Sequence, residues 1–285
     1  MLKRFITELG ILEKINSIVM LLVLMSIAAM AVSPELFDPL NPFSQNLDSA
    51  FKKPDGINIL GCDQLGRDLY SRIIHGASYS LWIGLSVATI TILIPIIFSS
   101  LVLFSGQIWN QFYLLLLDIF LVFPPLLLAI LIAASTDDPS TFQVVLALSL
   151  GGWAANGRLV RSYLMQVQEQ EFILAAKAVG ASDLRIYFFH LLPNILNQLT
   201  VLWSFRCGQM ILAEATLSFL GLGGGPDNLS WGWLVLEGKA HLTSAWLLSL
   251  APATLIALVV YAFQTLGETL EKLMLPRAPS KLLDG

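Results

Sequence analysis

The chain has 285 residues, of which 56% are hydrophobic and only 13% are charged. A soluble domain carries roughly a quarter charged residues, so this composition indicates an integral membrane protein. The formal net charge of −4, without any lysine- or arginine-rich run, excludes a broad nucleic-acid interface.

Six segments are apolar enough to cross a bilayer, whose hydrocarbon core takes about 20 residues of helix. They cover residues 16–34, 80–106, 112–135, 141–160, 196–220 and 244–266. The sequence therefore predicts an all-α membrane protein with about six transmembrane helices. We expect polar terminal segments at residues 1–15 and 267–285 and a loop with an amphipathic part at 35–79. The core would extend over 80–266 and include a polar loop at 167–193.

The first span has features of a signal peptide. It follows Lys3 and Arg4, and Ala29-Met30-Ala31 resembles a cleavage site. However, the apolar run is long for a signal peptide, and cleavage would leave five spans. We therefore expect a retained helix.

Charged residues gather just before the second span. Arg67 and Ser71 are four residues apart, as are Asp68 and Arg72, so the members of each couple would share a helix face. Asp63 is close enough in sequence to join local ion pairs on an amphipathic outer helix. This pattern predicts a helix fixed by surface ion pairs, with direct contact to a solute-delivering protein as the alternative.

Three charged residues fall within spans, and we expect Asp118 near the inner end of its span. An Asp or Arg at a helix centre costs roughly 2.5–3.5 kcal/mol on insertion, whereas one Leu or Ile returns only about 0.3–0.6 kcal/mol. The fifth span, with Arg206, Gln209 and Glu214, should therefore turn its polar side to protein or to a water-filled path. Residues 206 and 214 lie roughly 12 Å apart along the axis and cannot pair. Both pairing with another subunit and lining of a translocation pathway fit them.

A polar segment, EFILAAKAVGASDLRIYFFHLLPN (171–194), separates the fourth and fifth spans. Its apolar residues first recur at helical spacing, Gly180 can adopt the left-handed conformation that ends a helix, and Ser182 can cap the next helix. Pro193 suits the first turn of the following span and biases Leu192 towards an extended conformation. We expect a helix, a tight turn and a second helix at the membrane surface.

Small residues on this segment favour docking to another protein. Ala175, Ala176 and Gly180 would let another backbone approach closely. A helix resting on lipid is the alternative, but such helices usually carry a lysine- and arginine-rich polar face and bulky apolar side chains. This segment has only Lys177 and Arg185.

The distribution of lysine and arginine predicts the orientation. With the N-terminus inside, ten of these residues lie inside and five outside, which places both termini and the 171–194 segment in the cytoplasm. The ten inner residues are Lys3, Arg4, Lys14, Arg158, Arg161, Lys177, Arg185, Lys272, Arg277 and Lys281.

Enzyme motifs are missing from the sequence. There is no Gly-x-x-x-x-Gly-Lys-Ser/Thr phosphate loop, so the chain should not hydrolyse ATP, and neither His-Glu-x-x-His nor Gly-x-Ser-x-Gly occurs. Cys62, Cys207 and three scattered histidines lack metal-ligand spacing. An ATP-independent secondary transporter remains as an alternative, although such proteins usually have more spans, often in repeats.

The pattern Ala175-Ala176, then Gly180, then His190-Leu191-Leu192-Pro193 resembles the EAA loop of binding-protein-dependent ABC importer permeases. The resemblance implies a coupling helix that docks in a groove of an ATPase subunit. Leu174 stands where the motif usually has glutamate, so Glu171, one turn earlier, supplies the acidic contact or the contact is absent. The residues that would carry this coupling loop are Glu171, Ala175, Ala176, Gly180, Ser182, Asp183, His190 and Pro193.

Three further segments resemble those of dipeptide, oligopeptide and nickel importer permeases. They are GCDQLGRDLYSRIIHGASYSL (61–81), ILAEATLSFLGLG (211–223) with Trp231-Gly232 and Glu237-Gly238 after it, and LGETLEKLMLPR (266–277). The first matches at Gly61, Asp63, Gly66, Arg67, Asp68, Ser71, Arg72 and Gly76, while Cys62 replaces the usual threonine and Ser78 a common arginine. Together the matches extend over most of residues 59–280 and indicate the C-type permease subunit.

This resemblance implies a type I ABC importer permease fold in a bacterial inner membrane. The chain would form half of a path for peptides or a related solute, with nickel or a metal chelate among the possibilities. Its partners would be a B-type permease, two ABC ATPases at the cytoplasmic face and an extracytoplasmic solute-binding protein. ATP and magnesium would bind to the ATPases, and this chain would hold no cofactor.

Overall fold

The computed structural model describes residues 10–38, 40–136 and 140–274, and within these ranges the chain forms helices and turns without a β-strand. Lys3, Arg4, Arg277 and Lys281 lie outside the described residues, as do most of the predicted terminal segments.

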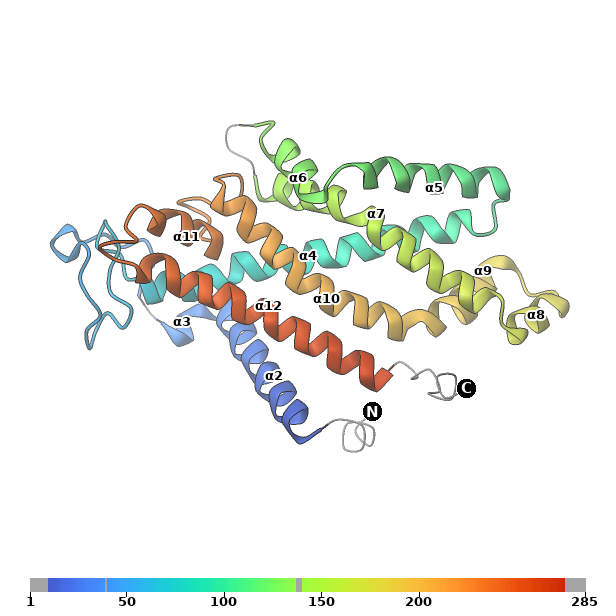
Figure 1. Ribbon diagram of the computed structural model, residues 1–285, viewed down its shortest axis with the longest axis horizontal. Helices are drawn as coiled ribbons and strands as arrows, with labels where there is room; N and C mark the ends of the chain where they lie inside the picture. Colours follow the sequence, from blue (N-terminus) through green and yellow to red (C-terminus); the bar gives the residue numbers. More distant parts are fainter. Residues whose placement is uncertain (1–9, 39, 137–139, 275–285) are drawn as a thin grey trace, which may run out of the picture.

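The helices follow the chain order shown in Figure 1, with a 3₁₀ turn at Leu47–Ser49 and a π-helical turn at Tyr187–Leu191. They are α2 (Ile11–Val32), α3 (Pro34–Phe37), α4 (Leu69–Val102), α5 (Gln107–Val122), α6 (Pro125–Ala133), α7 (Thr141–Gln168), α8 (Glu171–Ala178), α9 (Asp183–Ile186), α10 (Leu192–Phe219), α11 (Trp231–Lys239) and α12 (Leu247–Met274).

The predicted all-α membrane fold is confirmed. Helices α2, α4 and α12 are long and apolar enough to cross a membrane alone, and α5 with α6 forms a further candidate span bent by 78°. Helices α7 and α10, with 28 residues each, run in the same bundle but carry more polar side chains. The six predicted spans thus correspond to five long helices and one bent pair.

The bundle is elongated, with α4 at its centre (Figure 1). Helices α7 and α10 both pack against α4, α12 lies against α10, and the α5–α6 pair lies against α7. Helix α11 and the long 40–68 loop form one end of the molecule, and α8 and α9 form the other. Two buried apolar clusters lie between α4 and α10. One contains Ala88 and Ile211, and the other contains Ile92 and Leu199 and continues into the segment after α7.

Helix α2 crosses the edge of the bundle and pairs with the end of α12. Glu13 lies 2.8 Å from the ammonium of Lys272, and the hydroxyls of Ser17 and Thr269 are 2.7 Å apart. The start of α2 and the end of α12 therefore lie on the same side of the bundle (Figure 1).

Two local predictions differ from the structure. The second span was expected to begin at residue 80, but α4 begins at Leu69, because nothing between these positions breaks a helix and Asp68 caps its first turn. Leu192 was expected to be extended, yet its φ of −57° and ψ of −46° are helical. The preceding π-helical turn lets the Leu192 N–H bond to the carbonyl of Tyr187, so the chain reaches Pro193 without leaving the helix.

The ends of two further helices extend past the predicted spans. Helix α7 continues to Gln168 and α12 to Met274, so residues 267–274 of the predicted tail are helical. Both extensions are polar. Hydrophobic composition predicts only the apolar part of a helix, so it could not predict where these helices end.

Candidate functional site

The segment between α7 and α10 has the predicted helix, turn and second helix. Helix α8 ends at Ala178, and Gly180 then adopts a left-handed φ of +80°. The backbone N–H of Arg185 donates to the Ser182 hydroxyl, which caps α9. We call residues 169–191 the end segment.

One side of the end segment is fixed to the bundle. Ile173, Ile186, Tyr187 and Leu191 are fully buried in a cluster with residues of α7 and α10. The Tyr187 hydroxyl donates to the carbonyl of Ile96 in α4, at 2.7 Å. Burial raises the pKa of Tyr187 to about 12, so the phenol keeps the proton that it donates. Motion of the end segment is therefore coupled to three long helices.

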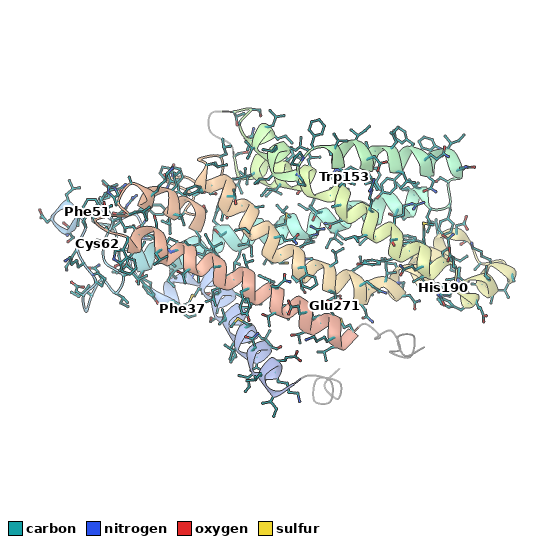
Figure 2. The ribbon with its side chains drawn as sticks, in the orientation of Figure 1. Phe37, Phe51, Cys62, Trp153, His190 and Glu271 are labelled. Carbon is teal, nitrogen blue, oxygen red and sulfur yellow. The ribbon has the colours of Figure 1, made fainter. Side chains whose placement is uncertain are left out.

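Six large apolar side chains of the end segment are exposed. Val179 is 85% exposed and Phe189 74%, and the six residues are Phe172, Leu174, Val179, Leu184, Phe188 and Phe189. We call these six residues the apolar end patch. Leu184, Phe188 and Phe189 also line an open pocket with Arg185 and His190, the latter labelled in Figure 2. The adjacent side chains of Leu184, Phe188 and Phe189 form exposed apolar surface of the kind that marks a contact with another protein or a membrane.

Seven of the predicted coupling residues lie in the end segment, and Pro193 follows it in the first turn of α10. Of all the predicted coupling residues, six are exposed, whereas Ala176 and His190 are half-buried, and Ala176 packs towards the buried cluster. The exposed residues are Glu171, Ala175, Gly180, Ser182, Asp183 and Pro193. Large apolar side chains of the same segment are exposed beside them, whereas the sequence argument for docking relied on the small residues.

At the opposite end, four charged side chains form a buried cluster, which we call the outer charge cluster. Asp63 accepts hydrogen bonds from Arg67 Nε at 2.6 Å and Arg72 Nη1 at 2.7 Å. Glu237 of α11 accepts from Arg67 Nη2 at 3.0 Å and from Arg72 Nη1 at 2.6 Å. Arg72 is only 1% exposed. The cluster joins the long loop, the start of α4 and α11 into one unit.

The predicted local ion pairs of Asp63 with Arg67 and Arg72 form, but their setting differs from the expected one. The pairs are buried rather than on the surface, and Asp68 does not pair with Arg72, because its carboxylate accepts from the N–H of Ser71 and from Asn58. Gly66 lies in the turn that returns the chain from Asp63 to Arg67. Glu237 was quoted only as part of a motif, and its role could not be foreseen because it is 165 residues from Arg72.

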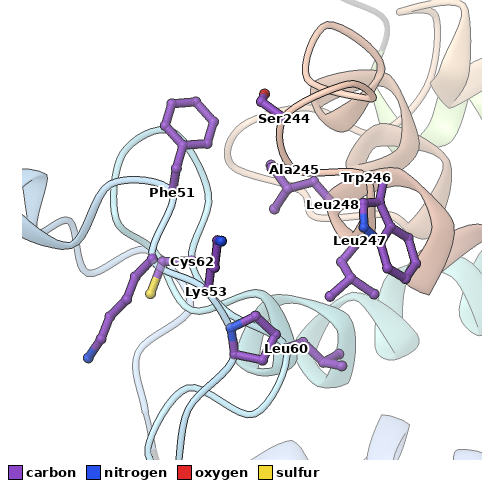
Figure 3. A pocket seen from close by; sticks show the side chains of 11 residues that line it. Phe51, Lys53, Leu60, Cys62, Ser244, Ala245, Trp246, Leu247 and Leu248 are labelled. Atoms are coloured by element: carbon purple, nitrogen blue, oxygen red, sulfur yellow. The ribbon is translucent and has the colours of Figure 1, made fainter.

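A pocket of about 390 Å³ opens beside this cluster (Figure 3). Loop residues 51–54, 60 and 62 form one wall, and residues 244–248 at the start of α12 form the other. Phe51 has a φ of +54° and its ring meets that of His241 edge-on at 4.8 Å. Lys52 bonds to Asp55 at 2.7 Å and lowers the pKa of that carboxyl to about 2, while burial raises the pKa of the Cys62 thiol.

The charged residues of the fifth predicted span are separated in α10. Arg206 is half-buried and donates to the exposed Gln209 at 2.6 Å. Glu214 is fully buried and accepts from the Ser218 hydroxyl at 2.6 Å. Arg206 and Gln209 therefore reach the surface of this chain, whereas Glu214 lies inside it.

Sequence comparison matches residues 91–278 to the family described as binding-protein-dependent transport system inner membrane component. The matched region contains every helix from the inner part of α4 to α12, including the end segment.

Curated relatives match over most of their length. A putative peptide transport system permease protein of Brucella suis is 34% identical over 261 residues, which cover 90% of this chain and 86% of the relative. The oligopeptide transport system permease protein OppC of Bacillus subtilis is 31% identical, with 90% and 84% covered. The glutathione transport system permease protein GsiD of Salmonella typhimurium is 34% identical, with 91% and 84% covered.

Proposed function

Because the chain belongs to the family of binding-protein-dependent transport system inner membrane components, we propose that it forms half of a path for peptides or a similar solute in an ABC importer. It is a permease subunit without an ATPase site of its own. The names of the relatives support the solute class, since these names refer to the transport of peptides, oligopeptides, glutathione or dipeptides.

The apolar end patch supports coupling of this subunit to ATPases. Six apolar side chains lie exposed on a segment that is fixed to α4, α7 and α10. A partner that binds the patch would therefore move the long helices with it. In the proposed mechanism, closure of two ATPases shifts the end segments as rigid bodies, and the spans follow.

The second half of the path would come from a related permease, and an extracytoplasmic binding protein would deliver the solute. The outer charge cluster and the pocket beside it belong to the end of the molecule opposite the end segment, where a delivering protein would dock. With α8 and α9 in the cytoplasm, both chain ends would also be cytoplasmic.

The first test is affinity purification of the tagged chain from its native membranes in a mild detergent. We expect a second permease and ATPases with phosphate loops to copurify. Substitution of Phe189 and Val179 by serine, both in the apolar end patch, should remove the ATPases from the preparation and leave the second permease. The matched control is Trp246→Ser. Trp246 is 54% exposed at the opposite end, and this variant should keep both partners bound.

The competing function is ATP-independent secondary transport. If the wild-type chain purifies alone, and membranes that contain it take up solute without ATP, the importer assignment fails. If ATPases copurify equally well with the Phe189 and Val179 variants, the importer assignment stands but the docking surface is wrong.

A further inference from the structure

An exposed ion pair connects α5 and α7 within the bundle. The Arg158 guanidinium donates to the Asp118 carboxylate, and the two side chains are 55% and 53% exposed. Asp118 is eleven residues after Gln107, roughly 16 Å along α5, so it lies well inside the helix rather than near its inner end as predicted. Arg158 is ten residues before the end of α7 at Gln168.

Helix α5 presents three different faces, because each residue advances the helix by about 100°. Tyr113 and Leu117 are its buried residues. An exposed apolar face, suited to lipid, consists of Ile108, Phe112, Leu115, Ile119 and Val122. An exposed polar face, roughly a quarter turn away, consists of Gln107, Gln111 and Asp118.

Helix α7 continues the polar face of α5. Arg158, Ser162 and Gln166 are exposed and follow one another at four-residue spacing. Arg161 holds the two helices together, because its guanidinium donates twice to Asn110 of α5, at 3.2 and 3.1 Å. We call Gln111, Asp118, Arg158, Ser162 and Gln166 the polar strip.

Lipid cannot cover the polar strip at low cost, since charged side chains within a membrane face protein or a water-filled cavity. The apolar face of the same α5 is available to lipid. The polar strip should therefore face the interior of the assembled transporter.

The break between α5 and α6 lies one turn beyond Asp118. Pro124 and Pro125 have no N–H, so the carbonyls of Phe120 and Leu121 cannot receive their helical hydrogen bonds. The chain bends by 78° here, and Phe123 at the bend is 53% exposed. Broken spans with free backbone groups commonly form solute sites in transporters. The break thus leaves two backbone carbonyls without their helical partners within one turn of Asp118.

We propose that Asp118 and Arg158 form a site on the wall of the translocation path for solutes that carry both an ammonium and a carboxylate, as the two ends of a peptide do. This inference rests on the proposed function. Asp118 binds the ammonium, and Arg158 binds the carboxylate through its planar fork of donors. When no solute is bound, the two side chains neutralise each other, which limits the free-energy cost of holding two charges within the membrane.

A charge exchange tests the site in the complete importer, purified with its binding protein and reconstituted in liposomes. The probe is a defined mixture of di- and tripeptides with free termini, and mass spectrometry measures their ATP-driven import. Asp118→Asn and Arg158→Gln should each lower import at least tenfold. The double variant D118R/R158D keeps an ion pair but reverses its polarity, so import should stay at least tenfold low.

The matched control is Lys272→Gln, which breaks the exposed Glu13–Lys272 pair and should leave import within twofold of wild type. Recovery of import in the exchanged variant would show that the Asp118–Arg158 pair is structural only and would overturn the site. Absence of peptide import by the wild-type complex would instead refute the proposed solute class.

Cysteine accessibility tests the location of the strip without any solute. In a variant lacking Cys62 and Cys207, Gln111→Cys and Ser162→Cys should react with a charged, membrane-impermeant methanethiosulfonate in the assembled importer. Leu115→Cys and Ile119→Cys, on the apolar face of α5, should not react. Protection of all four cysteines would mean that the strip is a dry contact with another subunit, which also overturns the proposal.

Discussion

Arg72 illustrates how charge is stabilised inside this protein. Its side chain is only 1% exposed, yet it lies between two carboxylates, Asp63 at 2.7 Å and Glu237 at 2.6 Å. Removing one partner of a buried pair leaves an uncompensated charge and typically costs about 3–5 kcal/mol. The cluster is therefore sensitive to loss of any one member.

We predict that Asp63→Asn lowers the free energy of unfolding by about 3–5 kcal/mol. The carboxylate serves both Arg67 and Arg72, and it also accepts from the backbone N–H groups of Leu65 and Arg67. Thermal unfolding in detergent would measure the loss. Asp55→Asn is the control, because its pair with Lys52 is exposed, and its melting temperature should not change.

Gly180 makes a second prediction at the residue scale. A Cβ at Gly180 would meet nothing within 4 Å, so we expect Gly180→Val to act through its φ of +80°, at a cost of about 1–2 kcal/mol. We expect α8 to reorient, and import per ATP hydrolysed should fall several-fold in a normally inserted protein.

Gly221 is a matched control for that change. It has a φ of +78°, equally open surroundings and a position at the opposite end of α10. Gly221→Val should cause similar backbone strain without altering the ratio of import to hydrolysis. An equal loss in both variants would argue against a coupling role for Gly180.

Some local features of the structure could be predicted from the residue type alone. The sequence indicated the left-handed turn at Gly180 and the cap at Ser182, because both depend on neighbours within four residues. It could not indicate the pairing of Arg72 with Glu237 or of Arg158 with Asp118, because helix packing brings these partners together.

At the scale of elements, α11 lies unusually close to α10. A Cβ at Gly232 would lie 2.2 Å from the carbonyl oxygen of Ala215, which is backbone and cannot turn away. We predict that Gly232→Ala separates the two helices and lowers stability by about 1–3 kcal/mol. Thermal unfolding in detergent would measure this loss.

Gly225→Ala is the control for α11. It lies in the loop that precedes α11, and an added Cβ would meet nothing within 4 Å. Its melting temperature should equal that of the wild type, whereas equal stability of both variants would contradict the close contact.

Apolar periodicity predicted the existence of the long helices but not their ends. Helix α4 includes eleven residues that were expected to form a separate amphipathic segment, since charged residues suggested a boundary where the backbone has none. Proline biases the residue before it towards an extended conformation, but no equally simple sequence rule predicts the π-helical turn before α10. The conformation of Leu192 was therefore predicted wrongly.

At the scale of the molecule, the two ends of the bundle should lie on opposite sides of the membrane. Alkaline phosphatase fused after Gly56, in the long loop, should be active, because the enzyme matures only outside the cytoplasm. Fusion after Gly180 should be inactive. The reverse result would invert the orientation and remove the end segment from the reach of cytoplasmic ATPases.

The class of protein was predictable because six apolar spans and four motifs agree with one family, and the family match confirms it. The surface that faces another subunit was less accessible to sequence reasoning. A lone aspartate in an apolar run does not reveal whether lipid, water or protein covers it.

The continuation of α4 from Arg72 to Ile96, with Pro95 near its inner end, has a mechanical consequence. Near one end Arg72 is held by the outer charge cluster, and 24 residues later the carbonyl of Ile96 accepts from the Tyr187 hydroxyl, so roughly 36 Å of helix joins the two attachments. A tilt of one degree about either attachment displaces the other by about 0.6 Å over that length. The helix acts as a lever, and small rotations at the face where nucleotide would be hydrolysed become ångström-scale displacements at the face where solute would enter.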